Sequence, residues 1–371
     1  MFSSHGKSRI ILHVDLDYFY AQCEVRRTPS LSNKPVVICQ FSGRTEFSGA
    51  VSTTNYVSRK FGVVSGMPIV TAKEKLDGED AVFLPTDREY YEKVSESIMS
   101  ILKSNADKFE QQSVDEAYLD VSERVAHSFE GGRNLAMKIK NDILDNEKLT
   151  CSIGVGPNKS VAKIASKYQK PDGLTVVDDN QVKEFMYKLP VAKMHGIGKK
   201  TEDKLRQLGI HTIKDLAIYD VEKLGEGIGK KLASYFHSVA VGEENEDVNE
   251  WEGQEQLSAI STLKEDTRLI ETILTELDKL SERVYRDIID EDLAFKSVSI
   301  IAVLENITVH TRSRTMETHI QNLDVLKRIS RKLFSDFLID EVDFQVRRIG
   351  VKVSNLSNKG GQTSLSEFLG G

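Results

Sequence analysis

Hydrophobic and polar positions in the first half of the chain follow two periods, one typical of strands and one typical of helices. Apolar runs and period-two alternation predict strands over residues 10–14, 34–39, 114–120 and 150–156. Apolar positions three and four residues apart predict helices over residues 90–103, 132–147 and 160–170. Around residues 114–120 the order is strand, helix, hairpin, helix, strand, which predicts a ferredoxin-like unit.

The second half of the chain changes pattern at two places. Residues 178–240 predict short helices broken by glycine, and residues 243–252 are polar and acidic without an apolar period. Beyond this linker, helices are predicted over residues 268–287 and 324–339, and strands over residues 297–304, 308–316 and 346–354. We therefore expect a multidomain α+β protein with a helical middle region. Its C-terminal domain is expected to hold a mixed sheet with helices on one face.

The composition is that of a globular protein large enough for several cores. The 371 residues are 39% hydrophobic and 29% charged, and this length suggests about two to four domains. No apolar run approaches the ~18 residues of a membrane span, and residues 1–9 lack the apolar core of a secretion signal. We expect a cytoplasmic protein that does not contact a membrane.

The cysteines and the net charge limit the kinds of partner. Cys23, Cys39 and Cys151 are odd in number and far apart, which fits a reducing cytosol and neither a disulfide framework nor a zinc site. The net charge of −7 argues against a wholesale polycation. Any contact with nucleic acid must therefore use local basic patches.

Acidic residues stand at the ends of two predicted strands. Asp15 follows the apolar run 10–14, and Asp115 and Glu116 lie together in the predicted hairpin. Two adjacent acids repel each other, so a fold that keeps both usually supplies a counter-charge. A solvated turn is the alternative for this pair taken alone. Three carboxylates on adjoining strand ends would instead hold a pair of hard divalent cations through oxygen.

A segment rich in glycine, serine and threonine precedes a short helix predicted over residues 57–62. Tyr56, Arg59 and Lys60, with the hydroxyls of this segment, suit a triphosphate, because Arg offers a fork of donors and Lys a point charge. The segment is not a Walker loop, and a solvated helix face is the alternative. Further along, the predicted helix 160–170 carries one basic stripe, made of Lys159, Lys163, Lys167 and Lys170.

Two Gly-Ile-Gly motifs, each followed by a pair of lysines, lie in the helical middle region. Their residues are Gly196, Gly198 and Lys199 in the first motif, and Gly227, Gly229 and Lys230 in the second. The first motif matches a helix-hairpin-helix, in which a glycine turn exposes backbone N–H groups to a DNA phosphate. Together the motifs predict binding to the DNA backbone that is independent of base sequence.

Basic residues occupy the predicted strands of the C-terminal domain without interleaved acids, at Arg312, Arg314, Arg347, Arg348 and Lys352. They predict one basic sheet face that lies along a duplex. A merely solvated sheet face is the alternative.

The last residues combine a glycine tether with an apolar cluster. The cluster follows Gly360 and Gly361, and it consists of Gln362, Leu365, Phe368 and Leu369. These side chains have no domain left to pack into. They predict a short turn of helix that inserts into a groove of another protein.

Several long motifs resemble, in the right order, those of a Y-family (DinB-type) translesion DNA polymerase, close to the archaeal branch. The motifs lie at residues 15–22, 48–62, 113–120, 163–165 and 170–173, and the resemblance spans residues 9–354. It implies a catalytic palm over residues 1–26 and 85–177, fingers over 27–84, a thumb over 178–242, a linker over 243–253, and a little finger over 254–354. The flexible tail over 355–371 resembles a PCNA-interacting box, Gln-x-x-Leu-x-x-Phe-Leu, with Leu where an aromatic is common.

The resemblance also implies roles for individual residues. Asp15, Asp115 and Glu116 would be catalytic and, with the Leu16 carbonyl, would hold two Mg²⁺. Tyr20 would be the steric gate against a ribose 2′-OH. The nucleotide would be contacted by Tyr18, Phe19, Tyr20, Ser52, Thr53, Tyr56, Arg59 and Lys170.

The implied activity is template-directed nucleotidyl transfer to a primer 3′-OH, with low fidelity, bypass of damaged template bases and no proofreading. Gly43, Ala50 and Ser52 indicate small side chains above the nascent base pair, and such an open site forgoes discrimination by shape. Gln40 stands where related sequences carry an aliphatic residue. The implied partners are primer–template DNA, a dNTP and a PCNA-type sliding clamp, for a nucleoid-associated monomer.

Two other functions fit parts of the sequence. A nucleotide cyclase on a similar palm is disfavoured by the Gly-Ile-Gly motifs and the basic strands, and activity on NTP without a primer would favour it. A non-catalytic, clamp-associated DNA-binding scaffold requires the acids to be a structural turn. Metal-dependent primer extension separates the scaffold from the polymerase.

Overall fold

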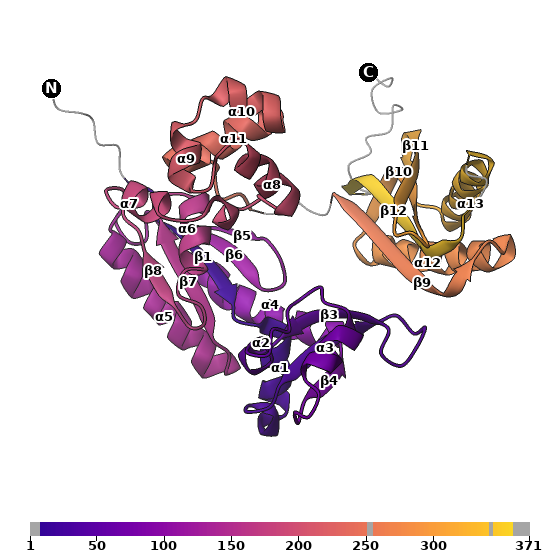
Figure 1. Ribbon diagram of the computed structural model, residues 1–371, viewed down its shortest axis with the longest axis horizontal. Helices are drawn as coiled ribbons and strands as arrows, with labels where there is room; N and C mark the ends of the chain where they lie inside the picture. Colours follow the sequence, from indigo (N-terminus) through magenta and orange to yellow (C-terminus); the bar gives the residue numbers. More distant parts are fainter. Residues whose placement is uncertain (1–7, 251–254, 341–343, 359–371) are drawn as a thin grey trace, which may run out of the picture. The chain divides into compact units, whose positions relative to one another are not determined.

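The structure, a computed structural model, describes residues 8–250, 255–340 and 344–358 (Figure 1). The chain forms two compact units: one comprises Met1–Gln40 and Ala50–Trp251, and the other comprises Phe41–Gly49 and Glu252–Gly371. Among the described helices, none is long and apolar enough to cross a membrane. The three cysteines are buried and free.

The first unit is built on a five-stranded sheet in the order β5-β6-β1-β7-β8. Its strands are β1 (Ile11–Leu16), β5 (Lys108–Gln111), β6 (Glu116–Asp120), β7 (Cys151–Gly156) and β8 (Leu174–Val176). With α4 (Arg88–Ser104) and α5 (Phe129–Glu147), the first four strands make the expected β-α-β-β-α-β unit, and each of their adjacent pairs is antiparallel. The ferredoxin-like prediction is confirmed.

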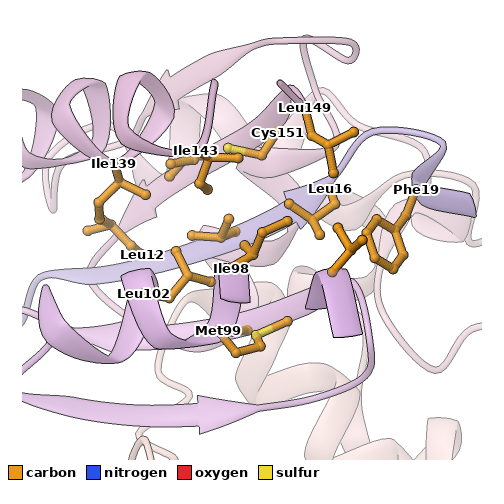
Figure 2. Close-up of a cluster of buried hydrophobic side chains, with 14 of the residues drawn as sticks. Leu12, Leu16, Phe19, Ile98, Met99, Leu102, Ile139, Ile143, Leu149 and Cys151 are labelled. Atoms are coloured by element: carbon orange, nitrogen blue, oxygen red, sulfur yellow. The ribbon is translucent and has the colours of Figure 1, made fainter. Parts of the chain in front are cut away.

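The two faces of this sheet bury different kinds of side chain. Leu12, Val14 and Leu16 alternate along β1 and pack with α4 and α5 in the apolar core that Figure 2 shows. The opposite face is covered by α6 (Lys159–Ser166). The helix lies so close that a Cβ on Gly154 would meet the carbonyl oxygen of Ala162 at 2.0 Å. Glycine at this position therefore sets the distance between helix and sheet.

Helix α6 is shorter than the sequence pattern predicted. It ends at Ser166, so Lys167 is its C-cap and Lys170 lies in the turn beyond it. The expected helix over residues 160–170, with all of its lysines on one helical face, is wrong at its C-terminal end. The reason is local: the chain leaves helical geometry before the Pro-Asp-Gly turn at residues 171–173.

The remaining elements of the first unit flank this sheet. The part between β1 and α4 contains α1 (Phe19–Arg27), η1 (Pro29–Leu31), β2 (Val36–Phe41), β3 (Gly49–Thr54), α2 (Tyr56–Arg59), α3 (Ile69–Lys75) and β4 (Val82–Pro85), with strand order β3-β2-β4. The helical part contains α7 (Val182–Tyr187), η2 (Val191–Lys193), α8 (Lys199–Gln207), α9 (Ile213–Ile218), α10 (Val221–Ile228) and α11 (Lys230–Val241). The predicted short helices of residues 178–240 are thus present.

The described part of the predicted linker packs against the first unit. Val248 is 1% exposed and lies with Ile11 and Tyr118 in a small apolar cluster. Glu244 is also buried and accepts a hydrogen bond from the backbone N–H of Ser160 at the start of α6, at 3.1 Å. The acidic residues of the predicted linker therefore include at least one side chain, that of Glu244, with a specific hydrogen-bond partner in the first unit.

The second unit has the same succession of elements with another strand order. It contains β9 (Gln256–Thr267), α12 (Ile270–Asp290), β10 (Leu293–Leu304), β11 (Val309–Ile320), α13 (Leu323–Asp340) and β12 (Val346–Asn358), with strand order β11-β10-β12-β9. The multidomain α+β class is confirmed. The sheet expected to be mixed is antiparallel in each adjacent pair, because β12 lies between the two parallel strands β9 and β10. Strand β9 was missed, although part of it alternates apolar and polar residues.

Candidate active site

A cavity of about 570 Å³ opens at one end of the five-stranded sheet. It gathers most of the residues that the family resemblance selects from distant parts of the first unit. Its lining comprises Asp15, Leu16, Tyr18, Phe19, Tyr20, Ser52, Thr53, Arg59, Ser65, Val114, Asp115, Glu116, Lys167 and Lys170. Tyr56 is absent from this lining but contacts it, because its ring lies edge-on to that of Tyr18 with centroids 5.2 Å apart.

The three acids are brought together by strand register. Asp15 and Glu116 are direct partners across the antiparallel β1–β6 pair, so their side chains share one face. The backbone N–H of Leu16 donates to the carbonyl oxygen of Asp115 at 2.9 Å, which joins the two strand ends. Asp115 precedes β6 and accepts a hydrogen bond from Ser113 Oγ at 2.6 Å. The acids are therefore not an isolated solvated turn.

Lysines from the end of α6 and the following turn supply the counter-charge that the sequence led us to expect. Lys163 Nζ lies 2.7 Å from Glu116 Oε2, and Lys167 Nζ lies 3.5 Å from Glu116 Oε1. Lys170 forms an ion pair with Asp15. Lys163 is only 6% exposed in its side chain, so this pair is well shielded from water. Three of the four lysines of the predicted stripe thus meet the site acids, whereas Lys159 pairs with Glu110.

The electrostatic environment shifts the pKa values of Asp15 and Glu116 in opposite directions. Burial raises the pKa of Asp15 to about 6, although Lys170 acts in the opposite direction. Partial burial also acts to raise the pKa of Glu116, but His13 and Lys163 outweigh it and hold that pKa well below its usual range. His13 lies fully buried beside them, and burial lowers its pKa to about 4, so the imidazole is neutral at physiological pH. Sequence reasoning missed His13, and it placed Lys163 in the basic stripe without identifying Glu116 as its partner, because only the tertiary contacts set these residues beside Glu116.

The donor chemistry of the site suits hard cations, while its side chains are engaged by lysines. Carboxylate oxygens and a strand-end carbonyl are the ligands that Mg²⁺ prefers. Within the described ranges, however, no three Asp, Glu, His or Cys side chains converge as an assembled ligand set. Asp15 and Glu116 are instead each neutralised by an ammonium group. The oxygen donors present fit a divalent cation.

Aromatic rings form one wall of the cavity. Tyr20 stacks on the buried ring of Tyr91, with centroids 4.4 Å apart and an angle of 18° between the ring planes. Arg59 lies over the ring of Tyr56 at 4.7 Å, and its Nε donates to the carbonyl oxygen of Thr54 at 3.1 Å. Both Tyr20 and Arg59 are thus held by contacts behind the cavity.

The two glycine motifs differ in structure. Gly196 has a φ of +85°, and Gly198 is the N-cap of α8, so the first motif makes the expected glycine turn before a helix. In the second motif Gly229, with a φ of +94°, separates α10 from α11. Gly227 instead lies inside α10, where an added Cβ would meet Leu208 at 3.0 Å. Gly227 therefore lies in a helix that packs near Leu208 and is not part of a turn.

The basic residues of the second unit do not share one sheet face. Arg312 and Arg314 on β11 oppose Ile300 and Val298, whose side chains are in the core under the helices. The guanidinium of Arg312 accordingly lies 5.8 Å from the ring centroid of Phe337 on α13.

Basic residues on strand β12, on the other side of β10 from β11, lie on the opposite sheet face. Lys352 opposes Ser299, and Arg348 opposes Val303, on the face away from that core. Arg347 lies at a register shift between Val346 and Arg348, where the simple alternation of a strand is interrupted. The prediction of a single basic face is wrong because Arg312 and Arg314 lie on the core side of the sheet, whereas Arg348 and Lys352 lie on the other side. The clamp-binding residues Gln362, Leu365, Phe368 and Leu369 lie outside the described residues.

Comparisons with known proteins match nearly the whole chain. The impB/mucB/samB family matches residues 14–167, the IMS family HHH motif matches residues 179–210, and the impB/mucB/samB family C-terminal domain matches residues 254–365. DNA polymerase IV of Methanosarcina acetivorans is 44% identical over 366 residues, which cover 97% of this chain and 99% of that protein. DNA polymerase IV of Nitrosopumilus maritimus is 41% identical over 363 residues, with coverages of 98% and 100%.

Solved structures give the same result. A Y-family DNA polymerase chimera of Dbh and Dpo4 matches with a TM-score of 0.89 at 36% identity, covering 94% of this chain and 99% of that chain. An insertion ternary complex of Dbh DNA polymerase matches with a TM-score of 0.69 at 35% identity and the same coverages.

Proposed function

Because the chain belongs to the impB/mucB/samB family of DinB-type Y-family DNA polymerases, we propose that the cavity at the end of β1 and β6 is its polymerase active site. The chain is a DNA-directed DNA polymerase of the translesion class. The single observation that carries the assignment of the site is the register pairing of Asp15 with Glu116, with Asp115 beside them at the same cavity.

The three acids and the Leu16 carbonyl would hold two Mg²⁺. When bound, these ions would lower the pKa of the primer 3′-OH and neutralise charge on the triphosphate and the departing pyrophosphate. The chain's own task is to keep the carboxylates ionised and in place. Lys163 and His13 serve this task at Glu116, whose pKa they hold well below its usual range against the effect of burial.

The triphosphate would be held by the basic side of the cavity. Arg59 and Lys170 line this side, and Tyr56 lies under the guanidinium of Arg59. Arg offers a planar fork to phosphate oxygens, and the ammonium of Lys170 is a point charge. Both would offset the negative charge that develops as the pyrophosphate leaves. Binding of the cations to Asp15 would free Lys170 for this contact.

The sugar and the base would lie against the aromatic wall. Tyr20 would exclude a ribonucleotide, because its ring would fill the space that a 2′-OH needs and its stacking on Tyr91 prevents retreat. Tyr18, Phe19, Ser52 and Thr53 line the same cavity and would contact the nucleotide. Low fidelity and bypass of damaged bases are expected because the side chains at residues 43, 50 and 52 are small. No proofreading activity is proposed.

Primer–template DNA is the proposed macromolecular substrate. The turn at Gly196 and Gly198, with Lys199 after it, would bind a backbone phosphate of the duplex. Gly229 and Lys230 would do the same at the start of α11. In the second unit, Arg348 and Lys352 share the sheet face away from the core and are the proposed contacts to the DNA backbone. A sliding clamp is the proposed partner of the C-terminal residues.

Primer extension tests this function directly. The protein should extend a primer on a template only when a divalent cation and the complementary dNTP are present. Replacement of Asp115 by Ala should abolish extension while DNA binding persists. Binding to DNA without any extension in the wild-type protein would favour the non-catalytic scaffold.

A further inference from the structure

Asp17 is a buried carboxylate just beyond the end of β1, and neither the sequence motifs nor the resemblance assigns it a role. Its exposed fraction is 0%. It accepts hydrogen bonds from Ser152 Oγ at 2.8 Å, from Thr150 Oγ1 at 2.9 Å and from the backbone N–H of Asp172 at 2.8 Å. Ion pairs among the described residues do not include it. Burial of a carboxylate costs free energy that hydrogen bonds must offset, and here neutral donors of β7 and of the turn after α6 supply these bonds.

The segment that these contacts hold is the turn after α6. Besides the bond from Asp172, Gly173 N–H donates to Ser152 Oγ at 3.2 Å, and Ile153 N–H donates to the carbonyl oxygen of Gly173 at 3.0 Å. The turn is therefore attached to β7 and to the end of β1 by successive hydrogen bonds. Lys170 lies two residues before Asp172 on this turn, and its ammonium enters the cavity at Asp15.

Gln22 fixes Asp17 from the other side. Its amide donates to the backbone carbonyl oxygen of Asp17 and, at 3.0 Å, to that of Thr150. Its carbonyl oxygen accepts from the backbone N–H of Thr150 at 2.7 Å. Asp17 is thus itself held by the start of α1 and by the residue before β7, so its carboxylate is a rigid acceptor for the turn.

We propose that Asp17 is a positioning residue for Lys170, which it serves by fixing the turn from which the ammonium reaches the triphosphate. The side chain of lysine has a long flexible stem, so the place of its charge depends on where the backbone is anchored. Loss of the anchor would let the turn move and would withdraw the charge from the phosphates. This inference rests on the proposed function, because that function puts a nucleotide in the cavity.

The test is a double-mutant cycle read by single-turnover primer extension at varied dNTP concentration, which separates the Kd of the dNTP from the maximal rate. Asp17→Ala should raise the Kd by about ten-fold, similar to Lys170→Ala, with a smaller effect on the maximal rate. The Kd of the dNTP in the double variant should be no higher than in Lys170→Ala alone, because both changes remove the same contact.

A conservative variant and a matched control distinguish positioning from general damage. Asp17→Asn should recover most of the affinity, because its amide oxygen still accepts from Asp172 N–H and its amide group can donate to the Ser152 hydroxyl. Asp172→Asn should keep the wild-type Kd, because its amide oxygen still accepts from Lys140 and its backbone N–H, which donates to Asp17, is unchanged.

Three results would overturn the inference. An unchanged Kd in Asp17→Ala would do so, as would losses that multiply in the double variant, or an Asp17→Asn protein no better than Asp17→Ala. If Asp17→Ala does not fold, Thr150→Val and Ser152→Ala each remove one donor to the carboxylate. Each of these variants should raise the Kd of the dNTP a few-fold when Lys170 is present and should not raise it further in Lys170→Ala. An unchanged Kd in both Thr150→Val and Ser152→Ala would again refute the role.

Failure of the proposed function would give a different pattern. Lys170→Ala would then leave the Kd of the dNTP unchanged, or Asp115→Ala would still extend the primer. If those two variants behave as proposed and Asp17→Ala leaves the Kd of the dNTP unchanged, only the positioning role of Asp17 is rejected.

Discussion

Asp15 and Glu116 face each other across the β1–β6 pair, although 100 residues of chain separate them along the sequence. Because partners in an antiparallel pair share a sheet face, their carboxylates open into one cavity. Ammonium groups of Lys170 and Lys163 neutralise the two acids there. This relationship turns two distant motifs into one site and is the basis of the first prediction.

Asp115→Ala should lower the rate of primer extension at least about a thousand-fold, because a carboxylate needed to hold the cations is lost. Affinity for primer–template DNA should change little. Asp120→Asn, at the other end of β6, is the matched control and should extend normally. Extension by Asp115→Ala at close to the wild-type rate would contradict the assignment of the site.

Tyr20→Ala should raise incorporation of ribonucleotides relative to deoxyribonucleotides by at least about ten-fold, because the ring that faces the cavity is removed. Competition between rNTP and dNTP in primer extension measures the ratio. Tyr20→Phe keeps the ring and its stacking on Tyr91, so it should retain the exclusion. The steric gate is refuted if Tyr20→Ala and Tyr20→Phe give the same ratio.

His13 should make the protein less stable in acid. Burial lowers its pKa to about 4, so the unfolded chain binds a proton below about pH 6.5 that the folded protein rejects. The stability from neutral His13 is fully present above about pH 6.5 and is lost as the pH falls toward 4. About 2 kcal/mol of unfolding free energy should disappear between about pH 7.5 and pH 5.

Urea unfolding at these two pH values measures the effect of His13. In His13→Asn the difference in unfolding free energy between these two pH values should be smaller by that amount. Exposed His211→Asn should leave the difference as in the wild-type protein. An unchanged difference in His13→Asn would mean that other groups cause the acid sensitivity.

Val248→Ala should lower the free energy of unfolding by about 1–2 kcal/mol, because a side chain buried against Ile11 and Tyr118 loses two methyl groups. Val64→Ala, at a position 52% exposed, should change it by less than about 0.5 kcal/mol. Thermal or urea unfolding compares them. Equal values for the two variants would mean that residues 243–250 do not contribute to the stability of the first unit.

Deletion of residues 362–371 should remove stimulation by a PCNA-type sliding clamp and leave basal extension intact. Processive synthesis on a primed template, with and without the clamp, measures both quantities. A matched variant with Ala at Leu365, Phe368 and Leu369 should reproduce the deletion. Loss of basal extension after the deletion would contradict a role confined to clamp binding.

Local patterns in the sequence were sufficient to predict most of the elements and the candidate acids. Apolar periods over residues 10–14 and 90–156 predicted the β-α-β-β-α-β order, and the motifs around Asp15 and Asp115 identified the polymerase family. These features are readable because a period of two or 3.6 is a local property of neighbouring residues.

Which charges meet, and which glycines lie in turns, depends on the tertiary structure. Lys163 and Glu116 become partners because α6 packs on the sheet face that carries Glu116, a contact between elements far apart in the chain. Gly227 lies inside α10 beside Leu208, although it occupies the same position in its motif as Gly196, which lies in a turn. Strand register and helix packing are non-local, so a local pattern specifies a side chain's chemistry but not its partner.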